Sequence, residues 1–133
     1  MSTNAEIIGD ALGLLNVLAE GESVSAEQGA HALRVLNQML AAWEADDIVL
    51  GYFAQSDTAD TCPIPDWAEQ GVGGKLALAL AAHYRTPPSP FAIAVADEGY
   101  SLILRTLMNQ RQVGADLSHL GSGNGRYDIL TDA

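Results

Sequence analysis

The chain has 133 residues, of which 48% are hydrophobic, and its formal net charge is −11 at pH 7. This length fits one domain, the apolar content excludes a wholly disordered chain, and no run of about 18 apolar residues is available to span a membrane. The single cysteine excludes an intramolecular disulfide and a cysteine-cluster metal site, and the acidic balance argues against a phosphate-binding surface.

The charge is concentrated in the first part of the chain. Residues 1–70 hold twelve of the 17 acidic residues and one basic residue, Arg34, whereas acids and bases balance in residues 71–133. The N-terminal sequence has no basic region ahead of an apolar run, so a secretory signal is not expected. An acidic side and a mixed side on one fold would allow copies to meet head to tail.

The first predicted helix covers residues 4–19. Thr3 and Glu6 form a capping box, in which the hydroxyl accepts an amide hydrogen bond and the carboxylate reaches back. Gly21 follows as a helix stop. The helix has one apolar stripe, made of Ile8, Leu12, Leu15 and Ala19.

The second predicted helix covers residues 26–45 and starts with a second capping box, Ser25 and Gln28. Its apolar stripe contains one polar residue, Asn37. A polar residue in such a position is usually hydrogen-bonded inside the core and fixes the packing. We therefore expect a structural role for this side chain.

Residues 46–65 break the helical pattern. Apolar residues alternate at Ile48, Leu50 and Tyr52, so a short strand or hairpin and an irregular loop both remain open. Long connections between helices are unusual in compact bundles and often carry binding function.

The third predicted helix starts near Pro65 and runs to about Tyr84. It is apolar nearly all round, which is typical of a buried central helix. The fourth covers about residues 90–112, with Ser89 as its cap. It carries two apolar stripes, which indicates two partners: Ile93, Ala96, Tyr100, Ile103 and Leu107 in one, and Phe91, Val95, Leu102 and Thr106 in the other.

The last residues are expected to form a flexible arm over residues 113–133. The run GSGNG is typical of a flexible spacer, and apolar residues lie on both sides of it. Docking of this arm on a partner and a frayed end are both open. The candidate anchors are Leu117, Leu120, Tyr127, Ile129 and Leu130.

Together these patterns predict an all-α fold. We expect a four-helix bundle in residues 1–112, a short irregular or hairpin insertion between its second and third helices, and the extended C-terminal arm in residues 113–133.

Motifs that would carry catalysis or bind a cofactor or metal were not found in the sequence. The three histidines lie far apart in the chain, GSGNG lacks the residues of a P-loop, and the acidic loop lacks the spacing of an EF-hand. Cys62 has no basic neighbour in sequence that would lower the pKa of its thiol. We therefore expect no catalytic residue, no cofactor and no metal.

Several short runs of residues occur in a characteristic order over roughly residues 4–112. They are Ile7, Ala11, Leu12 and Leu15 before Gly21-Glu22; Ser25-Ala26-Glu27, Ala32-Leu33, Leu36-Asn37, Met39-Leu40 and Trp43; and Ile64-Pro65-Asp66-Trp67, Leu76-Ala77, Ala82-His83-Tyr84 and Pro88-Ser89-Pro90. In this order and spacing the chain resembles the head-to-tail adaptors of tailed bacteriophages, also called tail accessory factors or packaged-DNA stabilisation proteins.

The resemblance implies a non-enzymatic structural protein of the virion neck, assembled from subunits in the host cytoplasm. Such adaptors form a ring, usually dodecameric, beneath the portal protein. The ring extends the DNA channel without sequence-specific binding, helps retain the packaged DNA and gives the next neck or tail protein a platform. No membrane is involved.

On this interpretation three groups of residues would act. The C-terminal arm, with the anchors named above, would dock on the portal. Contacts between subunits would pair Arg105 and Arg111 with a neighbour's acids, Glu44, Asp46 and Asp47. A tail-facing loop would present Ile48, Leu50, Tyr52 and Phe53.

Two other classes of function remain open. A small acidic regulator or DNA mimic that occupies a basic site on a host protein would have the same charge and helical content. A peptidoglycan-cleaving hydrolase would need a Glu and Asp pair, one of them with a raised pKa.

Overall fold

The structure is a computed structural model that describes residues 1–19 and 21–122, with the backbone alone over residues 113–122. Its elements are α1 (Asn4–Leu14), α2 (Ala26–Ala45), the 3₁₀ turn η1 (Asp66–Ala68), α3 (Glu69–Ala81) and α4 (Pro90–Ser122). Over these residues the fold is all-helical, as the sequence predicts, and the segment between α2 and η1 contains no strand. One isolated antiparallel bridge joins Thr3 to Thr61.

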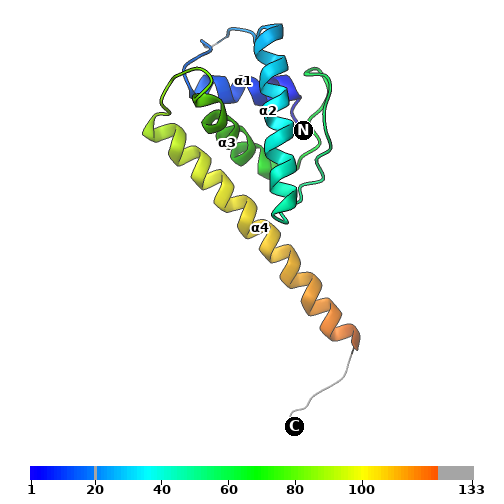
Figure 1. Ribbon diagram of the computed structural model, residues 1–133. Coiled ribbons are helices and arrows are strands. Elements are labelled where there is room, and N and C mark those ends of the chain that lie inside the picture. The colour runs from blue at the N-terminus through cyan, green and yellow to red at the C-terminus, as the bar shows by residue number, and fades with distance from the viewer. Residues whose placement is uncertain (20, 123–133) are drawn as a thin grey trace. The chain divides into compact units, whose positions relative to one another are not determined.

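By its contacts the chain divides into two units, residues 1–103 and residues 104–133, and the boundary falls within α4. In the first unit α3 contacts both α1 and α2, and the long loop after α2 runs back beside that helix (Figure 1). The largest buried side chains come from all of these elements and include Ile8, Leu12, Leu36, Ile64, Leu76, Leu80 and Ile103.

The helix α1 is shorter than predicted. It ends at Leu14, whereas the apolar pattern continues to residue 19. Asn16 adopts a left-handed conformation with φ of 58°, and the amide of Val17 donates to the carbonyl of Leu12. Asparagine tolerates this conformation better than most residues, so the chain turns here. Ala19 is consequently exposed and is not part of the core.

The start of α2 and its end agree with the prediction. The Ser25–Gln28 capping box is present, and the helix covers Ala26–Ala45. The third helix also begins where expected, through η1, but it ends at Ala81 instead of Tyr84. Arg85 adopts a left-handed φ of 53° in the turn that follows.

The helices α3 and α4 cross with their backbones in close contact. A Cβ atom built on Gly71 would lie 2.7 Å from the backbone of Gly99, and one on Gly74 would lie 2.6 Å from the Cα of Ala96. Only glycine fits these positions at this distance between the helices. The crossing is therefore specified by the small residues on both helices.

This crossing corrects the predicted apolar stripes of α4. The face that packs on α3 consists of Ala92, Ala96, Gly99 and Ile103, all buried. Ala96 and Ile103 are buried as predicted for the first stripe, whereas Ile93 of the same stripe is exposed. Phe91 of the second stripe, which was expected to meet another partner, is also exposed. The close approach at the glycines orients α4 so that small residues face the core beside Ile103.

The helix α4 is also longer than predicted. It was expected to end near residue 112, but it continues to Ser122, so residues 113–122 of the expected arm are helical. Within residues 1–19 and 21–122, none of the helices combines the length and apolar character of a membrane span.

Candidate functional site

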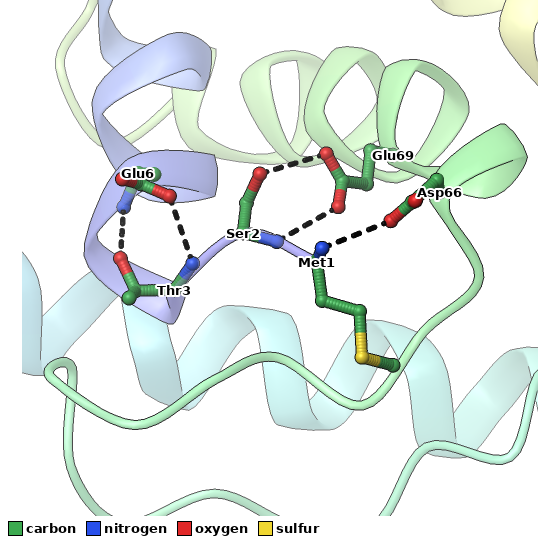
Figure 2. Close-up of polar contacts among 6 residues, drawn as sticks. All are labelled: Met1, Ser2, Thr3, Glu6, Asp66 and Glu69. Carbon is green, nitrogen blue, oxygen red and sulfur yellow. Dashed lines mark hydrogen bonds and ion pairs between the residues drawn. The ribbon is translucent and has the colours of Figure 1, made fainter.

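The N-terminal residues form polar contacts with η1 and with the start of α3. The amino group of Met1 pairs with Asp66 at 3.2 Å, and Ser2 binds both carboxylate oxygens of Glu69 (Figure 2). The Ser2 amide donates at 3.0 Å and its hydroxyl at 2.8 Å. These two bonds hold the Glu69 carboxylate in one orientation.

A second carboxylate is held beside this one on α1. The Thr3 amide donates to Glu6 at 3.0 Å, and the Glu6 amide donates to the Thr3 hydroxyl at 3.2 Å, which completes the predicted capping box (Figure 2). The acidic side chain also complements the positive end of the helix dipole. Glu6 and Glu69 are thus both positioned by residues of the N-terminal segment.

These carboxylates line an open groove of about 1150 Å³ within residues 1–103. Its walls come from α1, the turn at residues 16–22, α3 and Val95 of α4. The described lining contains four acids and no basic residue, together with apolar side chains: Glu6, Asp10, Glu22 and Glu69, then Leu14, Val17, Leu18 and Val95. Such a lining suits a partner that is both cationic and apolar.

The surroundings of Asp10 change its acidity. Partial burial raises the pKa of the Asp10 carboxyl above its usual value, and the charges of Glu6 and Glu69 raise it further. An ionised Asp10 is therefore repelled by these two carboxylates. A cation placed among them would relieve this repulsion. The sequence analysis missed this cluster, and only the spacing of Glu6 and Asp10, four residues apart on one helix, could have indicated part of it.

The long loop after α2 is fixed by Asn37, as the sequence predicts for this residue. Its Oδ1 accepts from the Tyr52 hydroxyl and from the Gln55 amide at 2.9 Å, and its Nδ2 donates to the Gln55 carbonyl at 2.9 Å. Buried Asn4 at the start of α1 also donates to the Gln55 side chain, at 3.1 Å. The loop therefore rests on two helices through polar side chains.

This arrangement exposes only part of the predicted tail-facing loop. Leu50 is buried, and Ile48 and Tyr52 are half-buried. Phe53 is 66% exposed, and Val49, which the sequence analysis did not select, is 52% exposed. The alternation seen in the sequence separates inward from outward residues here although no strand forms, because Val49, Gly51 and Phe53 are exposed while the residues between them are buried or half-buried.

The acids predicted for subunit contacts are brought together. Glu44, Asp46 and Asp47 are exposed at the C-terminal end of α2. The predicted basic partners, Arg105 and Arg111, are exposed on the part of α4 that belongs to the second unit. Pairing of these two groups between copies stays a prediction.

The predicted docking arm is described in part. Leu117 and Leu120 belong to the helical backbone of α4. Tyr127, Ile129 and Leu130 lie outside the described residues.

The described residues hold little that could support metal or nucleophile chemistry. None of them forms a group of three or more His, Cys, Asp or Glu side chains suited to a metal ion. Cys62 is fully buried, and burial raises the pKa of its thiol to about 11, with a further contribution from Glu69. A thiol of this kind is almost entirely protonated at neutral pH and is a poor nucleophile.

The described residues thus form a helical fold with charged surfaces, exposed apolar side chains and a loop held by Asn37. The chain belongs to the P22 tail accessory factor family, whose profile it matches over residues 1–133. It is therefore a structural accessory protein of tailed bacteriophages, with a place in the virion. None of the curated proteins compared with the chain is significantly similar to it.

Proposed function

We propose that this protein is a head-to-tail adaptor without enzymatic activity. Copies would form a dodecameric ring beneath the portal, extend the DNA channel, help retain packaged DNA and offer a platform to the next neck or tail protein. One observation carries the proposal: the whole negative charge of the chain lies in the first contact unit, and the second unit is neutral. Residues 1–103 hold 14 acids and three bases, and residues 104–133 hold three of each.

The difference in charge between the two contact units supports a ring. A closed ring needs a heterologous contact, in which two different surfaces of the same chain meet. An acidic first unit with a net charge of −11 and a neutral second unit that carries Arg105 and Arg111 offer such surfaces. Exposed ion pairs contribute only about 0–1 kcal/mol each, so they would set the register while apolar burial holds the copies together.

The same charge suits a channel for DNA. An acidic wall repels phosphates within about one Debye length, roughly 8 Å at physiological salt. DNA would therefore pass without sequence-specific binding. We expect the free protein not to bind duplex DNA in a mobility-shift assay at physiological salt, and tight binding that weakens steeply with added salt would contradict this role.

Two other features fit contacts with neighbouring components. The helix α4 continues beyond residue 112, to Ser122. The C-terminal arm would dock on the portal through its apolar residues Leu117, Leu120, Tyr127, Ile129 and Leu130. Phe53, exposed on a loop that Asn37 holds, would face the next neck or tail protein.

Mass measurement with the candidate portal ring tests the proposal. We expect many copies to join one portal ring, and we expect a chain lacking residues 121–133 to stay folded without joining it. A mass that shows no joined copies would contradict the adaptor role, and a truncated chain that still joins the ring would contradict the docking role of the arm. A DNA mimic would instead remain a monomer or dimer in the same experiment.

The acidic groove gives a second candidate, a cell-wall hydrolase, one specific observation in its favour. Asp10 has a raised pKa beside two further carboxylates, the property expected of a general acid. A cell-wall clearing assay tests this candidate. Clearing by the wild-type protein that Asp10→Asn abolishes would establish it, and the adaptor proposal predicts no clearing by either protein.

A further inference from the structure

The half of α4 in the second unit carries an exposed face of mixed character. Leu104 is 39% exposed and Met108 is 61% exposed, and because they are four residues apart they lie on the same side of the helix. Arg105 is exposed and lies three residues before Met108, so its guanidinium flanks this pair. The face thus offers two apolar side chains beside a cation.

The groove in the first unit has the complementary composition. Its carboxylates come from Glu6, Asp10, Glu22 and Glu69, and its apolar surface from Leu14, Val17, Leu18 and Val95. Glu6 and Glu69 are already oriented by hydrogen bonds from Thr3 and Ser2, so little side-chain freedom would be lost when a cation binds.

We infer that the groove of one subunit receives the Leu104–Met108 face of a second copy of this chain, with Arg105 placed among the groove carboxylates. This inference rests on the proposed ring and names its contact. The contact is heterologous, since groove and helix face are different surfaces, so it can repeat around a ring.

Two other contacts fit less well. Near the end of α2, Glu44 borders a hollow of only about 10 Å³, which leaves no room for Leu104 and Met108. The exposed loop residues Val49 and Phe53 could enter a groove, but their loop carries Asp46, Asp47, Asp57 and Asp60 and would be repelled by the groove acids.

Charge-reversing substitutions in the groove and on the helix face test the contact from both of its surfaces. Asp10 is exposed near the C-terminal end of α1, where a lysine complements the helix dipole, so Asp10→Lys should fold. Asp10→Lys and Arg105→Glu each place like charges in the contact. We expect each variant alone to need at least about a tenfold higher concentration to associate than the wild-type protein.

A mixture of the two variants provides the decisive measurement. In a ring in which the two variants alternate, each Asp10→Lys subunit presents a changed groove and an unchanged helix face, and each Arg105→Glu subunit presents the reverse. The changed groove would then meet the changed face, and the unchanged groove would meet the unchanged face. At every contact the charge at position 105 would then face the opposite charge at position 10, although Glu6, Glu22 and Glu69 remain in the groove, so an equimolar mixture should recover part of the association that each variant lacks alone. Equilibrium sedimentation of the free proteins, repeated with the portal ring, measures this. Asp60→Lys is the matched control, because Asp60 is exposed and lies outside the groove and the predicted subunit contacts: it should associate like the wild-type protein and should not rescue Arg105→Glu.

The outcomes separate this inference from the proposed function. Variants that associate like the wild-type protein, or a mixture no better than its components, would overturn the inference alone. A wild-type protein that stays monomeric with and without the portal would overturn both. Circular dichroism and thermal unfolding confirm that each variant is folded, and Asp10→Asn, which should weaken association less than Asp10→Lys, provides a milder second variant.

Discussion

At the scale of single residues, Asn37 explains how a long loop without strands keeps one conformation. One amide side chain satisfies a hydroxyl, a backbone amide and a backbone carbonyl of residues 52–55. Buried polar groups need such partners because an unpaired group costs free energy. The sequence indicates this role, since a polar residue interrupts an apolar stripe, but the partners could not be predicted because they lie in an irregular segment.

Replacing Asn37 should therefore loosen the loop. We expect Asn37→Ala to lower the free energy of unfolding by about 2–3 kcal/mol, since three hydrogen bonds are lost and buried groups of the loop are left unpaired. Urea denaturation measures the change. Gln38→Ala, at the exposed neighbouring position, should stay within about 0.5 kcal/mol of the wild-type protein, and equal effects of the two substitutions would contradict the role of Asn37.

Cys62 gives a prediction about reactivity and pH. Its thiol is fully buried with a pKa near 11, so a thiol reagent at pH 8 should label the unfolded chain and not the folded one. An unfolded thiol with a pKa near 9.0 loses its proton first as the pH rises, so the unfolded state binds fewer protons and the folded state is destabilised between about pH 9 and 11.

Urea denaturation at pH 8 and pH 10.5 measures this dependence. The loss of stability at the higher pH should be smaller in Cys62→Ala than in the wild-type protein. Rapid labelling of the native protein at pH 8 would show that the thiol is accessible and would contradict its burial.

At the scale of elements, the crossing of α3 and α4 sets which face of α4 is buried. Gly71, Gly74 and Gly99 allow backbone contact, and the larger residues Phe91 and Ile93 consequently face outward. Apolar periodicity alone ranks large residues as core, so it could not predict this rotation.

Two neighbouring glycines of α3 give a matched pair of variants. Gly71→Ala should destabilise the protein by about 1–3 kcal/mol, because its Cβ would lie 2.7 Å from the backbone of Gly99. Gly73→Ala meets nothing within 4 Å and should stabilise the helix by about 0.5–1 kcal/mol. Thermal unfolding of both variants checks the prediction, and equal effects would show that the crossing is looser than described.

Helix limits were predictable where a side chain marks them. The capping boxes at Thr3 and Ser25 fix the starts of α1 and α2. The ends of α1 and α3 are followed by left-handed turns at Asn16 and Arg85. Asparagine tolerates this conformation and is a weak local signal, whereas an arginine gives none. The last helix was predicted to end at about residue 112, yet α4 continues to Ser122.

At the scale of the whole molecule, the two contact units differ in charge. The net charge of −11 belongs entirely to residues 1–103, and residues 104–133 are neutral. The sequence predicts this asymmetry and the all-α class. It could not predict the groove, because Asp10, Glu69 and Val95 come together only when α1, α3 and α4 pack.

The central claim is that this chain works by joining other copies and a larger assembly. Electron microscopy of the protein mixed with its candidate portal measures this directly, because it shows whether the copies form one closed ring and where that ring lies. The account predicts a continuous ring of this chain beneath the portal and around the DNA channel. Images in which the portal carries no added density, while the protein remains as single subunits, would contradict it.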